Sequence, residues 1–135
     1  MDNTHGLSRF ILFGEDDIDD EEFLRDTFAK VDDSFTLLFV NTGQKVIPTL
    51  EKMHGDLPCL IVLDYNMPGL NAAEILKELQ AYNRYIHIPK VIWSTSGSDT
   101  YKTTCLNLGA TDYIIKPSSM QELEKAAQHM MSFCL

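Results

Sequence analysis

Five short apolar runs alternate with segments of helical periodicity along this chain. Such alternation favours a parallel sheet with helices on both faces, because parallel neighbours need a crossover connection and a helix supplies it. The apolar runs cover residues 9–14, 35–40, 59–63, 90–94 and 112–115, and the helical segments cover 19–31, 43–53, 71–82, 100–108 and 119–133. We therefore predict an α/β fold built on a five-stranded parallel sheet.

The helical segment 43–53 contains Pro48, which has no backbone N–H and clashes with the preceding turn of a helix. We expect Pro48 to shift the start of this helix or to kink it. The segment 100–108 is rich in threonine and is the other weak helix.

A length of 135 residues corresponds to about one domain. We predict a single domain over residues 9–133, an N-terminal tail over residues 1–8, and no output domain. The longest apolar run, residues 57–63, is too short to span a membrane, and the N-terminus has no signal-peptide pattern. These features predict a cytoplasmic protein.

The net charge of -9 is concentrated in one place, since seven of the 20 acidic residues fall within residues 15–22. A negative field repels phosphate backbones and anionic lipids. Nucleic acid and membrane surfaces are therefore not expected partners.

The three cysteines, Cys59, Cys105 and Cys134, are odd in number and form no C-x-x-C pair. We predict reduced thiols that pack in the interior. The four histidines are scattered and offer no metal-binding pair.

Polar residues that suit phosphoryl chemistry follow four of the predicted strands. Glu15, Asp16 and Asp17 follow the first strand, and Asp64 follows the third. Thr95 and Lys116 follow the fourth and fifth. The carboxyl ends of parallel strands meet at one edge of the sheet, so we expect these groups to form one site.

Crowded carboxylates resist ionisation unless a cation lies among them, and Mg²⁺ prefers oxygen ligands. Asp64 would be an oxygen nucleophile beside that ion, able to form an aspartyl-phosphate. Lys116 would pair with one phosphoryl oxygen, and the Thr95 hydroxyl would donate to another.

Four segments resemble motifs of the receiver domain of two-component response regulators, and together they cover its active site. They are ILFGEDD at residues 11–17, LDYNMPG at 63–69, STS at 94–96 and GATDYIIKP at 109–117. The likeness extends over residues 9–133, and the short chain looks like a stand-alone receiver of the chemotaxis type. The resemblance implies a flavodoxin-like, doubly wound (βα)5 fold with strand order 2-1-3-4-5.

The resemblance also implies a role in phosphorelay signalling. Asp64 would accept a phosphoryl group from a histidine kinase or a histidine phosphotransfer protein. Asp16 would bind Mg²⁺ directly, Glu15 through water, and Asn66 through its backbone carbonyl, and Asp64 would be the fourth residue of the metal site. Tyr113 would swing inward when Thr95 moves toward the phosphate.

A chain of this kind would bind an unknown downstream protein, as a monomer or weak homodimer. It would catalyse only its own phosphorylation and dephosphorylation, and in that sense it would not be an enzyme.

Several positions depart from the commonest receiver pattern. Gly14 replaces a bulky aliphatic residue, which would loosen the first strand or open space near the metal site. Ser94 stands directly before Thr95 where an aliphatic residue is usual, and Trp93 precedes it, which would change the packing under the loop that carries Thr95. The three consecutive acids allow two registers for the metal pair, and we prefer Glu15 with Asp16 to a set that includes Asp17.

Other interpretations remain for the same residues. Residues 19–22 are expected to begin a helix and face solvent, as acidic residues commonly do. A phosphatase or phosphotransferase of the haloacid dehalogenase type would need a second Asp where Asn66 stands. A flavodoxin-like cofactor binder would need a phosphate-binding loop where Glu15 and Asp16 stand. A receiver that acts without phosphorylation is the third alternative.

Overall fold

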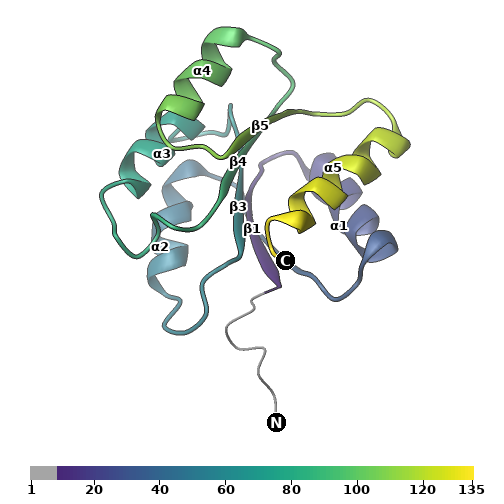
Figure 1. Ribbon diagram of the computed structural model, residues 1–135, viewed down its shortest axis with the longest axis horizontal. Coiled ribbons are helices and arrows are strands. Elements are labelled where there is room, and N and C mark those ends of the chain that lie inside the picture. The colour runs from purple at the N-terminus through teal and green to yellow at the C-terminus, as the bar shows by residue number, and fades with distance from the viewer. Residues whose placement is uncertain (1–8) are drawn as a thin grey trace.

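The computed structural model describes residues 9–135, in which a five-stranded parallel sheet lies between two layers of helices (Figure 1). The strand order is β2-β1-β3-β4-β5, which confirms the predicted fold class. The strands are β1 (Phe10–Gly14), β2 (Thr36–Val40), β3 (Leu60–Asp64), β4 (Lys90–Ser94) and β5 (Asp112–Ile115). The predicted tail, residues 1–8, lies outside the described residues.

The helices are α1 (Ile18–Val31), α2 (Val46–Glu51), α3 (Ala72–Leu79), α4 (Asp99–Asn107) and α5 (Met120–Ser132). A 3-10 turn, η2 (Gly43–Lys45), precedes α2. Pro48 therefore lies in the first turn of α2, where the missing N–H would have no partner within the helix. The expected shift of this helix start is confirmed.

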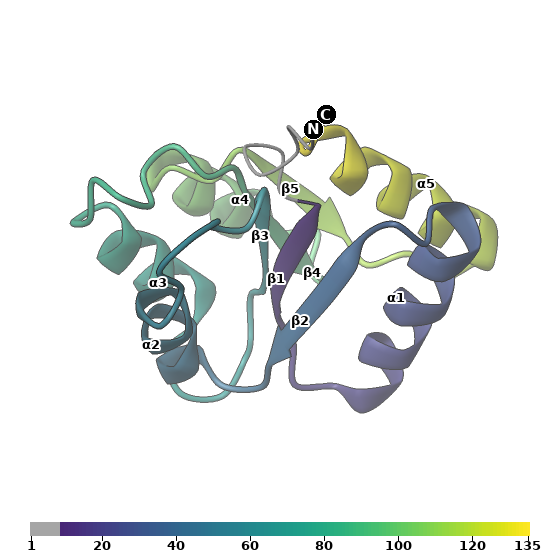
Figure 2. The ribbon, with the colours of Figure 1, turned by 90° about the horizontal axis from the view of Figure 1, so that it is seen from below.

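The two faces of the sheet carry separate apolar cores. Helices α2, α3 and α4 cover one face, and α1 and α5 cover the other (Figure 2). Successive strand residues point to opposite faces. Leu12 and Ile61 therefore pack beneath the three-helix layer, whereas Ile11 and Phe13 pack beneath α1 and α5.

Gly14 neither loosens β1 nor opens space at its end. The strand runs to Gly14, and Met67 fills the space that a side chain there would occupy. A Cβ built on Gly14 would lie 2.7 Å from the Met67 Cε atom. The expectation of a loosened strand is wrong, because the loop after β3 supplies the missing apolar group.

The prediction of three reduced thiols is wrong for two of the cysteines. Cys59 and Cys134 form a disulfide with their Cα atoms 5.1 Å apart, whereas Cys105 is free and buried. Cys59 lies next to the start of β1, where its amide donates to Phe10. The chain returns to the same end of the sheet after α5, which brings Cys134 there. Within residues 9–135, no helix combines the length and apolar character needed to cross a membrane.

Candidate functional site

Side-chain alternation along the strands brings four polar or aromatic groups to one face of the sheet. Glu15 follows the phase of Ile11 and Phe13, which point toward α1 and α5. The same phase places one group from each of the next three strands on that face: Asp64 after Val62, Trp93 after Val91, and Lys116 after Ile114. The carboxyl edge of the sheet therefore carries a site beneath the α1/α5 layer.

The Lys116 ammonium is the centre of this site. Its Nζ lies 3.0 Å from Oε1 of Glu15, 3.0 Å from Oδ2 of Asp64 and 2.8 Å from Oδ2 of Asp20. The lysine side chain is 11% exposed, so these contacts are largely shielded from water. One ammonium thus faces three carboxylates from β1, α1 and β3.

Asp16 adds a fourth carboxylate to the site. Glu15, Asp16 and Asp64 each have a carboxylate oxygen that lies within 4.8 Å of the others. Glu15 and Asp64 are buried, whereas Asp16 is exposed. Three carboxylate oxygens at this spacing form a candidate site for a cation, because one lysine does not neutralise them.

The protonation of the site follows from this crowding. Burial, together with the neighbouring Asp64, raises the pKa of Glu15 to about 7, although the Asp17 amide and Lys116 favour its ionised form. Burial alone would lower the pKa of Lys116, but hydrogen bonds to Asp20 and Asp64 and the charge of Glu15 raise it above its ordinary value. Lys116 is therefore charged at neutral pH. Glu15, with a pKa of about 7, loses its proton close to neutral pH.

The Asp64 carboxylate is held at both of its oxygens. Oδ1 accepts from the Asn66 amide at 3.1 Å, and Oδ2 accepts from Lys116. The Asp64 side chain is 11% exposed and so still reaches the surface. An oriented carboxylate with an open side is the arrangement that a nucleophile requires.

Two predicted residues lie at the same edge but outside the ion-pair cluster. Thr95 directly follows β4 and is exposed, and Asn66 is also exposed. Tyr113 already lies inward, 8% exposed, and its hydroxyl donates to the Ser96 carbonyl at 2.8 Å. Tyr113 is thus tied to the loop that carries Thr95, and its role as a switch stays a prediction.

Asp17 has a structural role that separates it from the metal pair. It is the N-cap of α1, and its Oδ1 accepts from the amides of Asp19 and Asp20 at 2.8 and 3.2 Å. This use of the carboxylate supports the register in which Glu15 and Asp16 form the pair.

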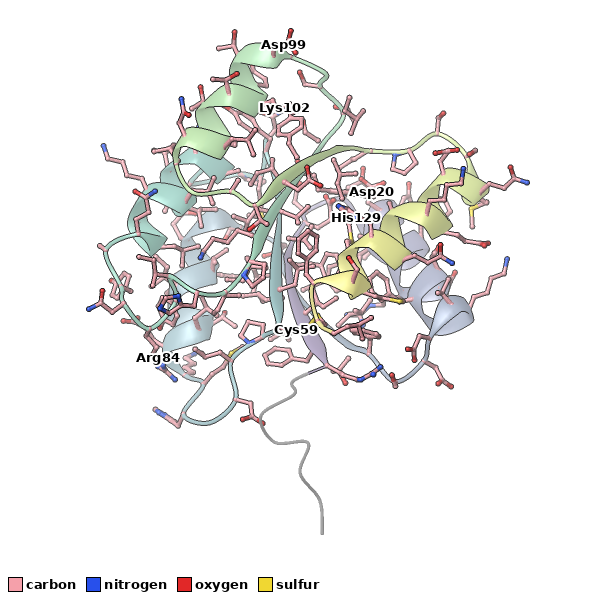
Figure 3. All side chains as sticks on the ribbon, viewed as in Figure 1. Asp20, Cys59, Arg84, Asp99, Lys102 and His129 are labelled. Carbon is pink, nitrogen blue, oxygen red and sulfur yellow. A yellow bond between two sulfur atoms is a disulfide. The ribbon has the colours of Figure 1, made fainter. Side chains whose placement is uncertain are left out.

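Two residues of the site were not predicted. The sequence predicts that Asp20 faces solvent at the start of a helix, yet Asp20 contacts Lys116 from the first turn of α1 (Asp20 is labelled in Figure 3). At Trp93 the sequence predicts only a change in packing, yet the Trp93 Nε1 donates to Oε1 of Glu15 at 2.9 Å. The alternation of β4 would have placed Trp93 on this face, whereas the contact of Asp20 depends on where α1 packs.

This fold and site define a class of α/β proteins with an acidic centre at the carboxyl ends of a parallel sheet. The family model described as "Response regulator receiver domain" matches residues 11–128. The chain therefore belongs to the response regulator receiver domain family. This membership does not favour the haloacid dehalogenase alternative.

Individual relatives agree with this assignment. The chain is 36% identical over 110 residues to response regulator RR06 of Streptococcus pneumoniae, covering 79% of this chain and 48% of that protein. It is 36% identical over 107 residues to a protein-glutamate methylesterase/protein-glutamine glutaminase of Treponema denticola, covering 77% of this chain and 28% of that protein. The chain thus spans half or less of the length of these curated relatives.

A solved structure shows the same fold. The phosphorylated cyanobacterial phytochrome response regulator RcpA superposes with a TM-score of 0.84 at 23% identity, and the match covers 93% of each chain.

Proposed function

We propose that Asp64 is the phosphoryl acceptor of this receiver and that Mg²⁺ occupies the site formed by Glu15, Asp16 and Asp64. The observation that carries the proposal is the position of Lys116, 3.0 Å from Asp64 beside a cluster of carboxylates that one lysine cannot neutralise. The donor would be a histidine kinase or a histidine phosphotransfer protein.

In this reaction an Asp64 oxygen attacks the phosphorus of a phosphohistidine. The new P–O bond forms as the P–N bond breaks, and the imidazole keeps the electron pair of the broken bond. Lys116, already oriented toward Asp64, would pair with a phosphoryl oxygen, and Thr95 would donate its hydroxyl to another. A bound Mg²⁺ would neutralise charge on the phosphoryl oxygens.

Asp16 and Glu15 fit this ion in different ways. Asp16 is exposed and is free to bind the ion directly, whereas Glu15 is 2% exposed and already accepts hydrogen bonds on both oxygens. We therefore assign direct coordination to Asp16, contact through water to Glu15, and further contacts to Asp64 and the Asn66 carbonyl. Mg²⁺ accepts such mixed sets of protein oxygens and waters.

The output would be a change in the surface near Thr95 and Tyr113 that an unknown downstream protein recognises. The receiver would catalyse only its own phosphorylation and slow hydrolysis, with no separate substrate, in the cytoplasm, as a monomer or weak homodimer.

Labelling with a small phosphodonor tests the acceptor. Acetyl phosphate with Mg²⁺ should add one phosphoryl group to the wild-type protein, measured by intact-protein mass spectrometry, and none to Asp64→Asn. The exposed Asp56→Asn is a matched control and should be labelled like the wild type. Equal labelling of Asp64→Asn and wild type would reject Asp64 as the acceptor. Loss of labelling on addition of EDTA would support the requirement for a bound Mg²⁺ ion.

A further inference from the structure

Trp93 places its indole against the acidic site, although the phosphoryl transfer proposed above gives it no role. It lies in β4 in register with Asp64 of β3 and Ile114 of β5. The residue is 3% exposed, and its Nε1 donates to Oε1 of Glu15 at 2.9 Å. An indole N–H can only donate, so the orientation of this contact is fixed.

The hydrogen bonds of Glu15 leave it little freedom. An ionised carboxylate offers about four lone-pair positions. Oε1 accepts from Trp93 and contacts Lys116 at 3.0 Å, and Oε2 accepts from the Asp17 amide at 3.1 Å. Asp64 forms a further side-chain contact with Glu15, and the group is 2% exposed, so it has room for no more than a single contact with a water of the ion.

The two side-chain donors to Oε1 are not equivalent. Lys116 is shared with Asp20 and Asp64, and in the proposed reaction it turns to a phosphoryl oxygen. The Trp93 side chain is 3% exposed and packed in the core beneath α1 and α5, so it cannot follow that movement. It also lies beneath the ammonium, with the Lys116 Nζ 5.8 Å from the ring centroid.

We propose that Trp93 is a positioning residue of the metal site, whose indole N–H keeps the Glu15 carboxylate turned toward the ion while Lys116 changes partners. The inference rests on the proposed function, because it requires Mg²⁺ to bind at Glu15, Asp16 and Asp64. Partners of this kind typically contribute about 10- to 100-fold to metal affinity.

The wild-type protein offers a direct readout, because Trp93 is its single tryptophan and gives one indole N–H signal in a ¹H–¹⁵N spectrum. Titration with Mg²⁺ should shift this signal and the Asp64 backbone amide along the same saturation curve. A shift at Asp64 with an unmoved indole signal would overturn the inference and leave the metal site standing. No shift at either position up to millimolar Mg²⁺ would overturn the proposed metal site and the inference together.

Variants separate the hydrogen bond from packing. Trp93→Phe keeps an aromatic ring but loses the N–H, and it should weaken Mg²⁺ binding about tenfold in a calorimetric titration. Val91→Ala removes apolar volume from the same strand and the same core, and it should bind Mg²⁺ like the wild type. Wild-type affinity in Trp93→Phe, or an equal loss in Val91→Ala, would overturn the inference. Should Trp93→Phe fail to fold, the wild-type titration decides alone.

Discussion

Glu15 is a carboxyl group that folding moves from water into a nearly closed site. Its pKa rises from an ordinary value of 4.5 to about 7, mainly because of burial. Between these two values the folded state binds more protons than the unfolded state, so stability falls as pH rises. In the metal-free protein, the free energy of unfolding should therefore decrease by roughly 2 to 3 kcal/mol between pH 4.5 and 7 through this group. Urea denaturation at several pH values in EDTA measures the effect.

The matched variant Glu15→Gln cannot titrate and should lose this contribution. Its stability curve should be flatter than that of the wild type over the same pH range. Suppose that the free energy of unfolding of the wild type rose with pH and that Glu15→Gln gave the same curve. This result would contradict the assignment of the titration to Glu15.

Asp20 shares Lys116 with the other two carboxylates, since its Oδ2 lies 2.8 Å from Nζ and one oxygen of each of the others lies 3.0 Å from it. Asp20→Asn would leave Lys116 bound more closely to Glu15 and Asp64 and would remove a negative charge. Both changes should weaken Mg²⁺ binding, by up to about fivefold for a partly exposed charge. Asp19→Asn is a matched control in the same helical turn, exposed and absent from the cluster. Equal losses in both variants would show a general charge effect rather than a role of the Lys116 contact.

The sequence predicts those residues of the site whose positions follow from the alternation of side chains along a strand. Glu15, Asp64 and Lys116 continue the phase of buried strand residues, so the sequence places them at one edge. The sequence does not reveal Asp20 in the same way, because its contact crosses 96 residues and depends on the packing of α1 beside α5.

The strands were easier to predict than the contacts between helices and loops. Each observed strand boundary lies within one residue of the prediction, because buried runs in a parallel sheet are continuous and short. A threonine-rich helix such as α4 carries little apolar periodicity, and its packing could not be predicted from spacing. One such unpredicted contact joins α4 to the loop after β3.

That contact is a stack of two tyrosines. The rings of Tyr65, directly after Asp64, and Tyr101 of α4 lie 4.3 Å apart with an interplanar angle of 10°. A stacked aromatic pair contributes about 0.5–1.5 kcal/mol beyond its buried area. Tyr101→Leu should therefore lower the free energy of unfolding by about 1 kcal/mol, measured by urea denaturation.

A double-mutant cycle with Tyr65→Leu isolates the stack from the loss of each ring. If the two rings stabilise each other, the double variant should lose less stability than the sum of the single variants. Strict additivity would mean that the stack contributes nothing of its own. Amide exchange in the first turn of α4 should be faster in Tyr101→Leu.

At the scale of the whole molecule, the two ends of the sheet carry different chemistry. The carboxylates, Lys116 and Thr95 lie at the carboxyl ends of the strands, and the disulfide lies at the opposite end, where Figure 3 labels Cys59. The cysteine count did not reveal this bond, because its partners are 75 residues apart and meet only through the return of the chain after α5. Reduction should thus alter stability without altering Mg²⁺ binding.

The disulfide closes a loop of 75 residues, so it restricts the unfolded chain strongly. Chain-entropy arguments give about 4.5 kcal/mol for such a loop as an upper value, and about 2 to 4 kcal/mol is typical of disulfides. In urea denaturation, the free energy of unfolding of the oxidised protein should exceed that of the dithiothreitol-treated protein by this amount. For Cys134→Ser, the free energy of unfolding should be the same with and without dithiothreitol. Thiol titration in denaturant should find one thiol, Cys105, before reduction and three after it. Three titratable thiols in protein purified without reductant would contradict the Cys59–Cys134 disulfide.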